Sequence, residues 1–302
     1  MKKYYSLYLI LFLICISDLH AQWLIFDQIY RNYSKRTEIG KSEYVITYNY
    51  CFVRDTIKKI KYYDKQVLQY GEKHSRYTSL FAEKTDSLMY NYFAKSQIKT
   101  RPKNGADGFS FSAITQLQDN EKAMYEDIFF NYPKEGYLYV STNILETEYI
   151  YVESIPQFDW KLQADTTTIL GYKCIKAVTT FRGRDYEVWF TPFIPIRQGP
   201  WKFNGLPGLI LKAVDTKGYF EWTAVEIEKK NNEIYKYVDY ANISSTNRKD
   251  VIRLLQMRWK DPIRLYFIKN PNLQTFTING KDYKNSSNFD IQLPHCPIPE
   301  LE

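Results

Sequence analysis

The sequence predicts a mainly β protein, a β-rich α+β fold whose antiparallel sheet curls or forms an open barrel, with about two covering helices. Many segments are rich in β-branched and aromatic residues and alternate in part, which is typical of strands. Aromatic residues make up 17% of the chain, with 28 Tyr and 18 Phe. Tyr suits a two-faced sheet because its ring packs while its hydroxyl reaches water. Only two segments show helical spacing, so a curled sheet is favoured over a sandwich.

The first predicted elements are two strands and a helix. Residues 43–53 and 58–69 carry strand-forming residues. Apolar side chains between residues 79 and 96 recur at three- and four-residue steps, which predicts a helix that Ser79 can cap. This apolar stripe packs on the core or, as the alternative, faces a ligand. The polar residues 100–120 predict a long loop.

The centre of the chain predicts an antiparallel meander. Turn-forming residues, such as those over 182–185, separate short runs of strand-forming residues. The predicted strands cover residues 125–132, 136–142, 146–153, 166–170, 172–180, 186–191, 209–215 and 219–227.

A second helix is expected over residues 245–261, capped by Ser245 or Thr246 and stopped by Pro262. Its apolar stripe consists of Val251, Leu254, Leu255 and Trp259. Its other face carries basic side chains, which are solvated or, as the alternative, contact anionic lipid or another acidic partner. These are Arg248, Lys249, Arg253, Arg258 and Lys260.

The ends of the chain suggest an exported protein with one domain. Lys2 and Lys3 precede an apolar run, and a cut after Ala21 makes residues 1–21 a signal peptide. Residues 22–302 then form a single β-rich domain, periplasmic or secreted. A lipid anchor on Cys15 is disfavoured because Ile14 is not small. The rest of the chain has no apolar run long enough for a membrane helix, so an integral membrane protein is not expected.

Charge and cysteine content restrict the partners further. The formal net charge of +7 is spread along the chain, which does not favour nucleic acid in an exported protein. Cys51, Cys174 and Cys296 remain after cleavage of the leader. An odd number allows at most one internal disulfide among them, and three buried thiols are the alternative.

A run of Gly and Pro among large apolar residues covers residues 199–211 and leads into the predicted strand over residues 209–215. Its distinctive residues are Gly199, Pro200, Gly205, Leu206, Pro207, Gly208, Leu209 and Ile210. With the preceding strands, this run resembles the GLPGLI family of exported proteins from Bacteroidetes, most clearly over residues 169–225. The resemblance implies an exported β-rich protein and no settled activity.

Two roles fit this signature run. Pro207 fixes its own φ and biases Leu206 to extended geometry, while Gly205 and Gly208 allow positive φ or a close backbone approach. These residues suit a structural buckle that turns the chain into a core strand. They also suit a groove in which the backbone of a ligand lies flat on glycine.

The residues predict no catalytic, metal-binding or cofactor-binding site. His74 and His295 lack metal-ligand spacing, and no phosphate loop or nucleophile elbow is present. The main hypothesis is a non-catalytic envelope protein that holds an apolar, lipid-like or extended partner, such as a peptide or another envelope protein. The alternatives are a hydrolase acting on peptides or glycans, through paired carboxylates or through Cys296 or Cys174 beside a histidine, and a purely structural or docking module.

Overall fold

The computed structural model describes residues 35–96, 121, 123–145, 147–238, 243–272, 274–278, 281–284 and 297–300. The predicted signal peptide over residues 1–21 and the predicted loop over residues 100–120 lie outside these residues, as do His295 and Cys296. None of the helices among the described residues is long and apolar enough to cross a membrane.

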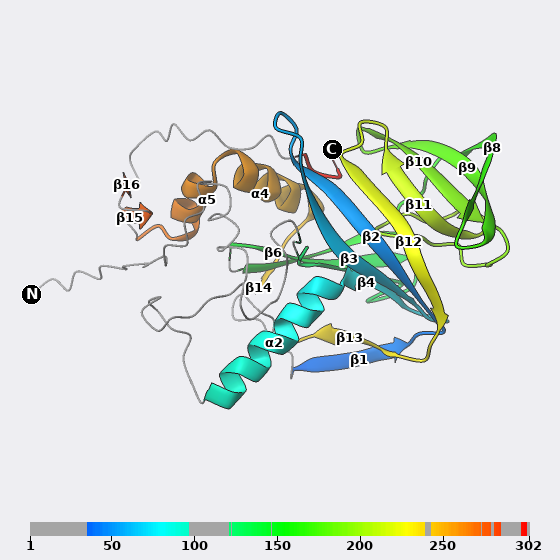
Figure 1. Ribbon diagram of the computed structural model, residues 1–302. Coiled ribbons are helices and arrows are strands. Elements are labelled where there is room, and N and C mark those ends of the chain that lie inside the picture. The colour runs from blue at the N-terminus through cyan, green and yellow to red at the C-terminus, as the bar shows by residue number, and fades with distance from the viewer. Residues whose placement is uncertain are drawn as a thin grey trace, which may run out of the picture.

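The described chain is dominated by strands, which confirms the predicted β-rich class (Figure 1). The strands are β1 (Arg36–Lys41), β2 (Tyr44–Asp55), β3 (Ile60–Tyr70), β4 (Ser75–Ser79), β5 (Glu126–Phe130), β6 (Tyr137–Ile144), β7 (Thr147–Ser154), β8 (Lys161–Ile169), β9 (Tyr172–Phe181), β10 (Arg184–Thr191), β11 (Leu209–Asp215), β12 (Phe220–Lys229), β13 (Glu233–Tyr237), β14 (Ile243–Ser245), β15 (Thr275–Ile278) and β16 (Lys281–Lys284). The helices are α2 (Leu80–Ser96), α4 (Arg248–Lys260) and α5 (Pro262–Lys269).

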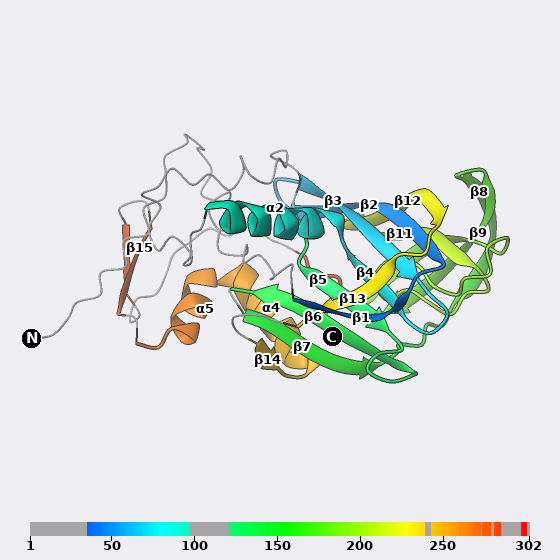
Figure 2. The same ribbon diagram turned by 90° about the horizontal axis from the view of Figure 1, so that it is seen from below.

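One sheet of 12 strands forms the body of the molecule, in the order β14-β7-β6-β5-β4-β3-β2-β12-β11-β10-β9-β8. Adjacent strands in this sheet are antiparallel, except for the short parallel pair β14–β7. The sheet is not closed into a barrel, because β14 and β8 lie at opposite edges. It is nevertheless strongly curved, since the β5–β7 part lies below β2, β3 and β12 in Figure 2. The protein therefore has a curved, open sheet, as predicted.

The structure confirms one predicted helix cap and corrects the other. Ser79 caps α2 as expected, since its hydroxyl accepts a hydrogen bond from the Ala82 amide at 2.9 Å. The cap of α4 was predicted wrongly: Asn247, rather than Ser245 or Thr246, accepts from the Asp250 amide. Pro262 does not only stop α4 but opens α5, because proline at the first helical position gives up no hydrogen bond. The described chain thus has three helices.

Aromatic side chains fill the interior beside β9–β12. The ring centroids of Trp201 lie 5.3 Å from Phe203 and 6.1 Å from Trp222. All three side chains are at most 4% exposed. Such ring pairs add about 0.5–1.5 kcal/mol each to the stability given by burial. Two of these rings belong to the signature run, so the run is part of the core.

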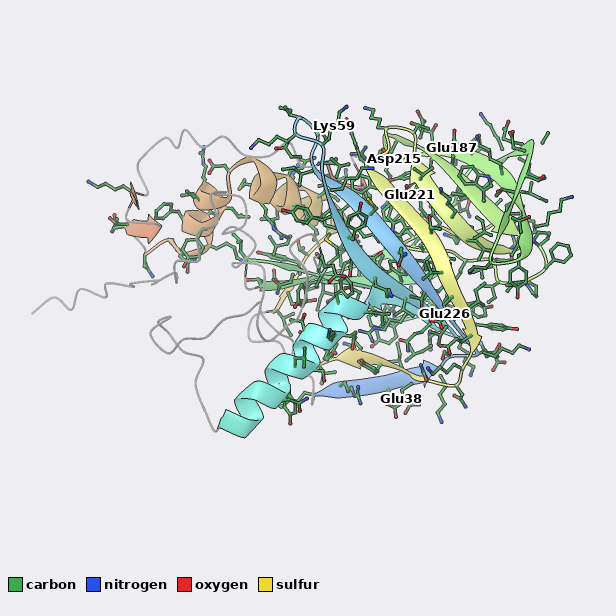
Figure 3. All side chains as sticks on the ribbon, in the orientation of Figure 1. Glu38, Lys59, Glu187, Asp215, Glu221 and Glu226 are labelled. Atoms are coloured by element: carbon green, nitrogen blue, oxygen red, sulfur yellow. The ribbon has the colours of Figure 1, made fainter. Side chains whose placement is uncertain are left out.

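The opposite face of these strands is partly open to solvent. Glu187 on β10 and Glu221 on β12 project from it in Figure 3. They pair with Lys176 and Lys212 at 2.9 and 2.8 Å. Exposed pairs of this kind contribute about 0–1 kcal/mol, so this face adds little to stability.

Candidate functional site

The signature run forms the connection between β10 and β11 and reverses the chain direction within it. The Gly199 amide donates to the carbonyl of Phe203 at 2.9 Å, and the Phe203 amide donates to that of Pro200 at 3.2 Å. Trp201 has φ +54° and Gly205 has φ +95°. Positive φ favours glycine, so Trp201 is the unusual residue of this turn.

The glycines and apolar residues of the run contact the chain itself. A Cβ added to Gly208 would lie 2.1 Å from the Thr191 oxygen, and one added to Gly199 would lie 2.6 Å from the Cβ of Ile210. The space beside these two glycines is therefore filled by the protein's own atoms. Pro200, Leu206, Leu209 and Ile210 are buried, and Gly205 and Pro207 are exposed.

The turn carries Lys202 into the protein, where only 1% of its side chain is exposed. Its Nζ donates to the hydroxyl of Tyr151 at 2.9 Å, to Glu153 at 2.8 Å and to Glu300. Arg182 and Arg248 bind the same two carboxylates. We call these six residues the Lys202 cluster: Tyr151, Glu153, Arg182, Lys202, Arg248 and Glu300.

Burial and nearby charges shift the pKa values of the carboxyl groups in and around the Lys202 cluster in opposite directions. Burial disfavours the charge of Lys202, yet Tyr151, Glu300 and Glu153 outweigh it and raise the Lys202 pKa. Burial would also raise the pKa of Glu300, but Lys202 and Arg182 hold it below its usual range. Nearby Glu126 has a pKa raised to about 7, chiefly by burial. One acid of the region is therefore largely protonated below neutral pH while Glu300 is ionised.

Sequence reasoning missed Lys202 and its partners. The available signal was a lysine between Trp201 and Phe203, in a run whose other side chains are mostly apolar. The partners Glu153, Arg182 and Glu300 lie far apart in sequence, so spacing could not connect them. A buried cation must find a counterion, and this rule alone would have called for an acidic partner.

The cysteine and histidine predictions fall outside the Lys202 cluster. Cys51 and Cys174 carry free thiols, and burial raises the pKa of both. His74 packs edge-on against Tyr132, with ring centroids 6.2 Å apart. Across the part of the chain that the structure describes, no group of three or more His, Cys, Asp or Glu side chains could hold a metal ion.

A second candidate surface is the outer edge of the sheet. β8 is the last strand and, among the described strands, pairs only with β9. Its residues are exposed on both faces from Lys161 to Thr168, and Leu162 is 60% exposed. Figure 1 and Figure 2 show this strand at the rim of the molecule. Its outer backbone groups are thus available to another strand.

The register shows which residues of β8 point outward. Leu170 and Gly171, both with positive φ, form a two-residue turn between the paired Ile169 and Tyr172. The pair beside such a turn is hydrogen-bonded, and hydrogen-bonded and open pairs then alternate. Thr168 therefore directs its amide and carbonyl to the free edge, whereas Thr167 directs its own toward β9.

Part of the chain resembles a known protein family. Residues 109–254 are similar to the family described as "N-glycanase peptide, N-terminal domain". A comparison with curated proteins gives no match. Among solved structures, PNGF-II in two crystal forms is 16% identical, with TM-scores of 0.41 and 0.40, and 74% and 72% of this chain are covered. The aligned part spans about a third of the PNGF-II chains, 34% and 33%.

A second solved structure belongs to an uncharacterized conserved protein from Thermus thermophilus. It is 13% identical with a TM-score of 0.33, and the alignment covers 75% of this chain and 99% of that one.

Proposed function

We propose that the protein is a non-catalytic binding protein, exported to the cell envelope, that takes an extended polypeptide as an added strand on β8. The exposure of β8 on both faces and along its outer edge carries this proposal. In strand addition, backbone hydrogen bonds give affinity while alternate side chains give specificity. The run Thr166-Thr167-Thr168 has the β-branched residues that favour such pairing.

The interior supports an extended partner rather than an apolar cargo. A carrier needs aromatic and aliphatic side chains that line an internal space. Here the rings of Trp201, Phe203 and Trp222 contact one another instead. This packing beside β9–β12 supports a partner that binds at the surface. The similarity of residues 109–254 to a domain of an N-glycanase supports a glycosylated polypeptide as the partner to test first.

The test uses the full chain and an array of 12-residue peptides, each in unmodified and N-glycosylated form. Affinities of the bound peptides are then measured for the wild type and for Thr168→Pro. Proline at position 168 removes the amide that faces the free edge, so we expect at least a tenfold loss of affinity. Thr168→Ala keeps that amide and should bind as the wild type does.

Two results would overturn the proposal. One is an array on which no peptide binds the wild-type chain. The other is equal binding by Thr168→Pro and the wild type, at equal thermal stability. As a check on the register, Thr167→Pro removes an amide directed toward β9 and should lower stability itself.

A hydrolase acting on peptides or glycans is the second candidate, favoured by the carboxyl groups near Lys202. The pKa of Glu126 is raised to about 7 by burial, while that of Glu300 lies below its usual range. In many enzymes, two acids whose pKa values differ in this way act as the general acid and the general base. The N-glycanase similarity covers Glu126, Glu153 and Lys202.

An assay with an N-glycopeptide distinguishes the two candidates. The binding proposal expects the wild-type chain to leave the peptide and the glycan intact. Release of glycan or peptide fragments by the wild type, lost in Glu126→Gln and retained in Thr168→Pro, would instead establish the hydrolase.

A further inference from the structure

The segment Pro297–Glu300 lies against the sheet, where side chains of β10 donate hydrogen bonds to its backbone carbonyls. Nε of Arg184 donates to the carbonyl of Ile298 at 2.7 Å. The hydroxyl of Tyr186 donates to the carbonyl of Pro299 at 2.9 Å. Ile298 is only 6% exposed. Two backbone acceptors and one apolar side chain are therefore bound within two residues, Ile298 and Pro299.

Glu300 adds a charge-specific contact to this segment. Its carboxylate pairs with Lys202, Arg182 and Arg248, and 4% of the side chain is exposed. Glu153 is the other carboxylate of the Lys202 cluster, so three cations face two anions. Without Glu300 the three cations would lose a carboxylate that all of them contact, and removing one partner of a buried ion pair is strongly destabilising. The site therefore requires an anionic group at this position.

The composition of the segment suits a peptide ligand. Pro297 and Pro299 have fixed φ, and Pro299 biases Ile298 to an extended conformation. A segment held extended before binding loses less conformational entropy on docking. Proline also has no amide hydrogen, so the segment presents carbonyl acceptors to Arg184 and Tyr186. Proline-rich and acidic recognition are here combined in one site.

We propose that the Lys202 cluster, with Arg184 and Tyr186, is a recognition site for an acidic, proline-containing peptide of the pattern Pro-apolar-Pro-Glu. Pro297–Glu300 occupies it as an internal ligand, and a polypeptide with the same pattern binds there in exchange. This site does not involve β8 and stands independently of the strand-addition proposal.

The test uses the full chain with Glu300→Gln, which keeps the shape of the internal ligand but removes its charge. The probe is a fluorescent, acetylated peptide Pro-Ile-Pro-Glu-Leu-Glu, and its matched control has Gln in place of the first Glu. The internal segment is present at high effective concentration in the wild type, so little probe should bind. We expect Glu300→Gln to bind the probe at least tenfold more tightly than the wild type does. We also expect it to prefer the probe over the Gln control by at least tenfold.

A second measurement covers the case in which Glu300→Gln fails to fold. A protease site is inserted between residues 284 and 297 of the otherwise wild-type chain, which is cut after folding. Native mass spectrometry then follows exchange of the released segment for the fluorescent peptide. Exchange with the Glu peptide and not with the Gln control supports the proposal.

Each remaining outcome decides the question. Equal binding of the two peptides by folded Glu300→Gln would overturn the proposal, as would a cut chain that never exchanges its segment. A concentration-dependent dimer that disappears in Glu300→Gln would support exchange and identify a second copy of this chain as the partner. Arg248→Met should weaken probe binding in the Glu300→Gln background, whereas Arg253→Met, on the exposed side of α4, should not.

Discussion

At the scale of single residues, Gly208 leaves the least room for a side chain among the glycines of the described part of the chain. A Cβ there would lie 2.1 Å from the oxygen and 2.6 Å from the carbon of Thr191, so β10 or β11 would have to shift. We expect Gly208→Ala to lower the free energy of unfolding by about 3 kcal/mol.

The matched control for this prediction is Gly40→Ala. A Cβ at Gly40 would meet only a ring carbon of His74, at 3.7 Å, which is ordinary contact. Urea unfolding of both variants measures the difference. If Gly208→Ala were as stable as Gly40→Ala, the close packing of the signature run would be refuted.

Prediction from sequence was uneven at this scale. Glycine and proline could be placed in a turn, because few other residues adopt the conformations that a turn demands. The apolar neighbours Trp201 and Phe203 are the one local hint at Lys202, and they do not show that its side chain is held inside the protein. Its burial depends on Glu153 and Glu300, which the fold brings together, and a single sequence does not show such contacts.

At the scale of elements, the position of a strand or helix in the sequence was easier to predict than the other elements that it contacts. β2, β3 and α2 begin and end close to the expected residues, since each has its own periodic pattern. β4 and β13, of five residues each, were not predicted. The Lys202 cluster joins β7, α4 and the loop before β11, and no pattern within one element contains that information.

The Lys202 cluster gives a prediction about how elements are held together. Lys202→Met removes the cation between Glu153 and Glu300, and Tyr151 also loses its partner. We expect the free energy of unfolding to fall by about 3–5 kcal/mol, the usual effect of breaking a buried ion pair. Equilibrium unfolding in urea measures this value.

Lys212→Met is the matched control, because Lys212 forms an ion pair with Glu221 on the exposed face at 2.8 Å. Exposed pairs contribute about 0–1 kcal/mol, so this variant should unfold close to the wild type. Similar losses in both variants would mean that the Lys202 cluster does not hold β7, α4 and the signature run together.

At the scale of the whole molecule, two acids with raised pKa values, Glu126 and Asp64, should make stability depend on pH in an unusual direction. Glu126 has a pKa of about 7, against an ordinary value of 4.5, and Asp64 has a pKa of about 7, against 3.8. Burial is the main cause for both. The folded protein therefore holds protons that the unfolded chain has lost, so the free energy of unfolding falls as pH rises from about 4.5 to 7. Glu300 acts oppositely, because its lowered pKa stabilises the fold at neutral pH and that contribution is lost in acid.

These opposing effects place the greatest stability in mildly acidic solution, and Glu126→Gln tests this directly. Glutamine resembles the protonated acid and cannot ionise, so the variant should lack the part of the decline that Glu126 causes. We expect that part to be on the order of 2 kcal/mol between about pH 4.5 and 8. Urea unfolding across this range gives the two profiles, with Glu187→Gln on the exposed face as the control. A wild-type profile that rises toward high pH, or a Glu126→Gln profile parallel to it, would show that the Glu126 carboxyl is ionised at little cost in the folded protein. The carboxyl groups around Lys202 would then be fully charged, and the protonation difference that favours a hydrolase would be absent.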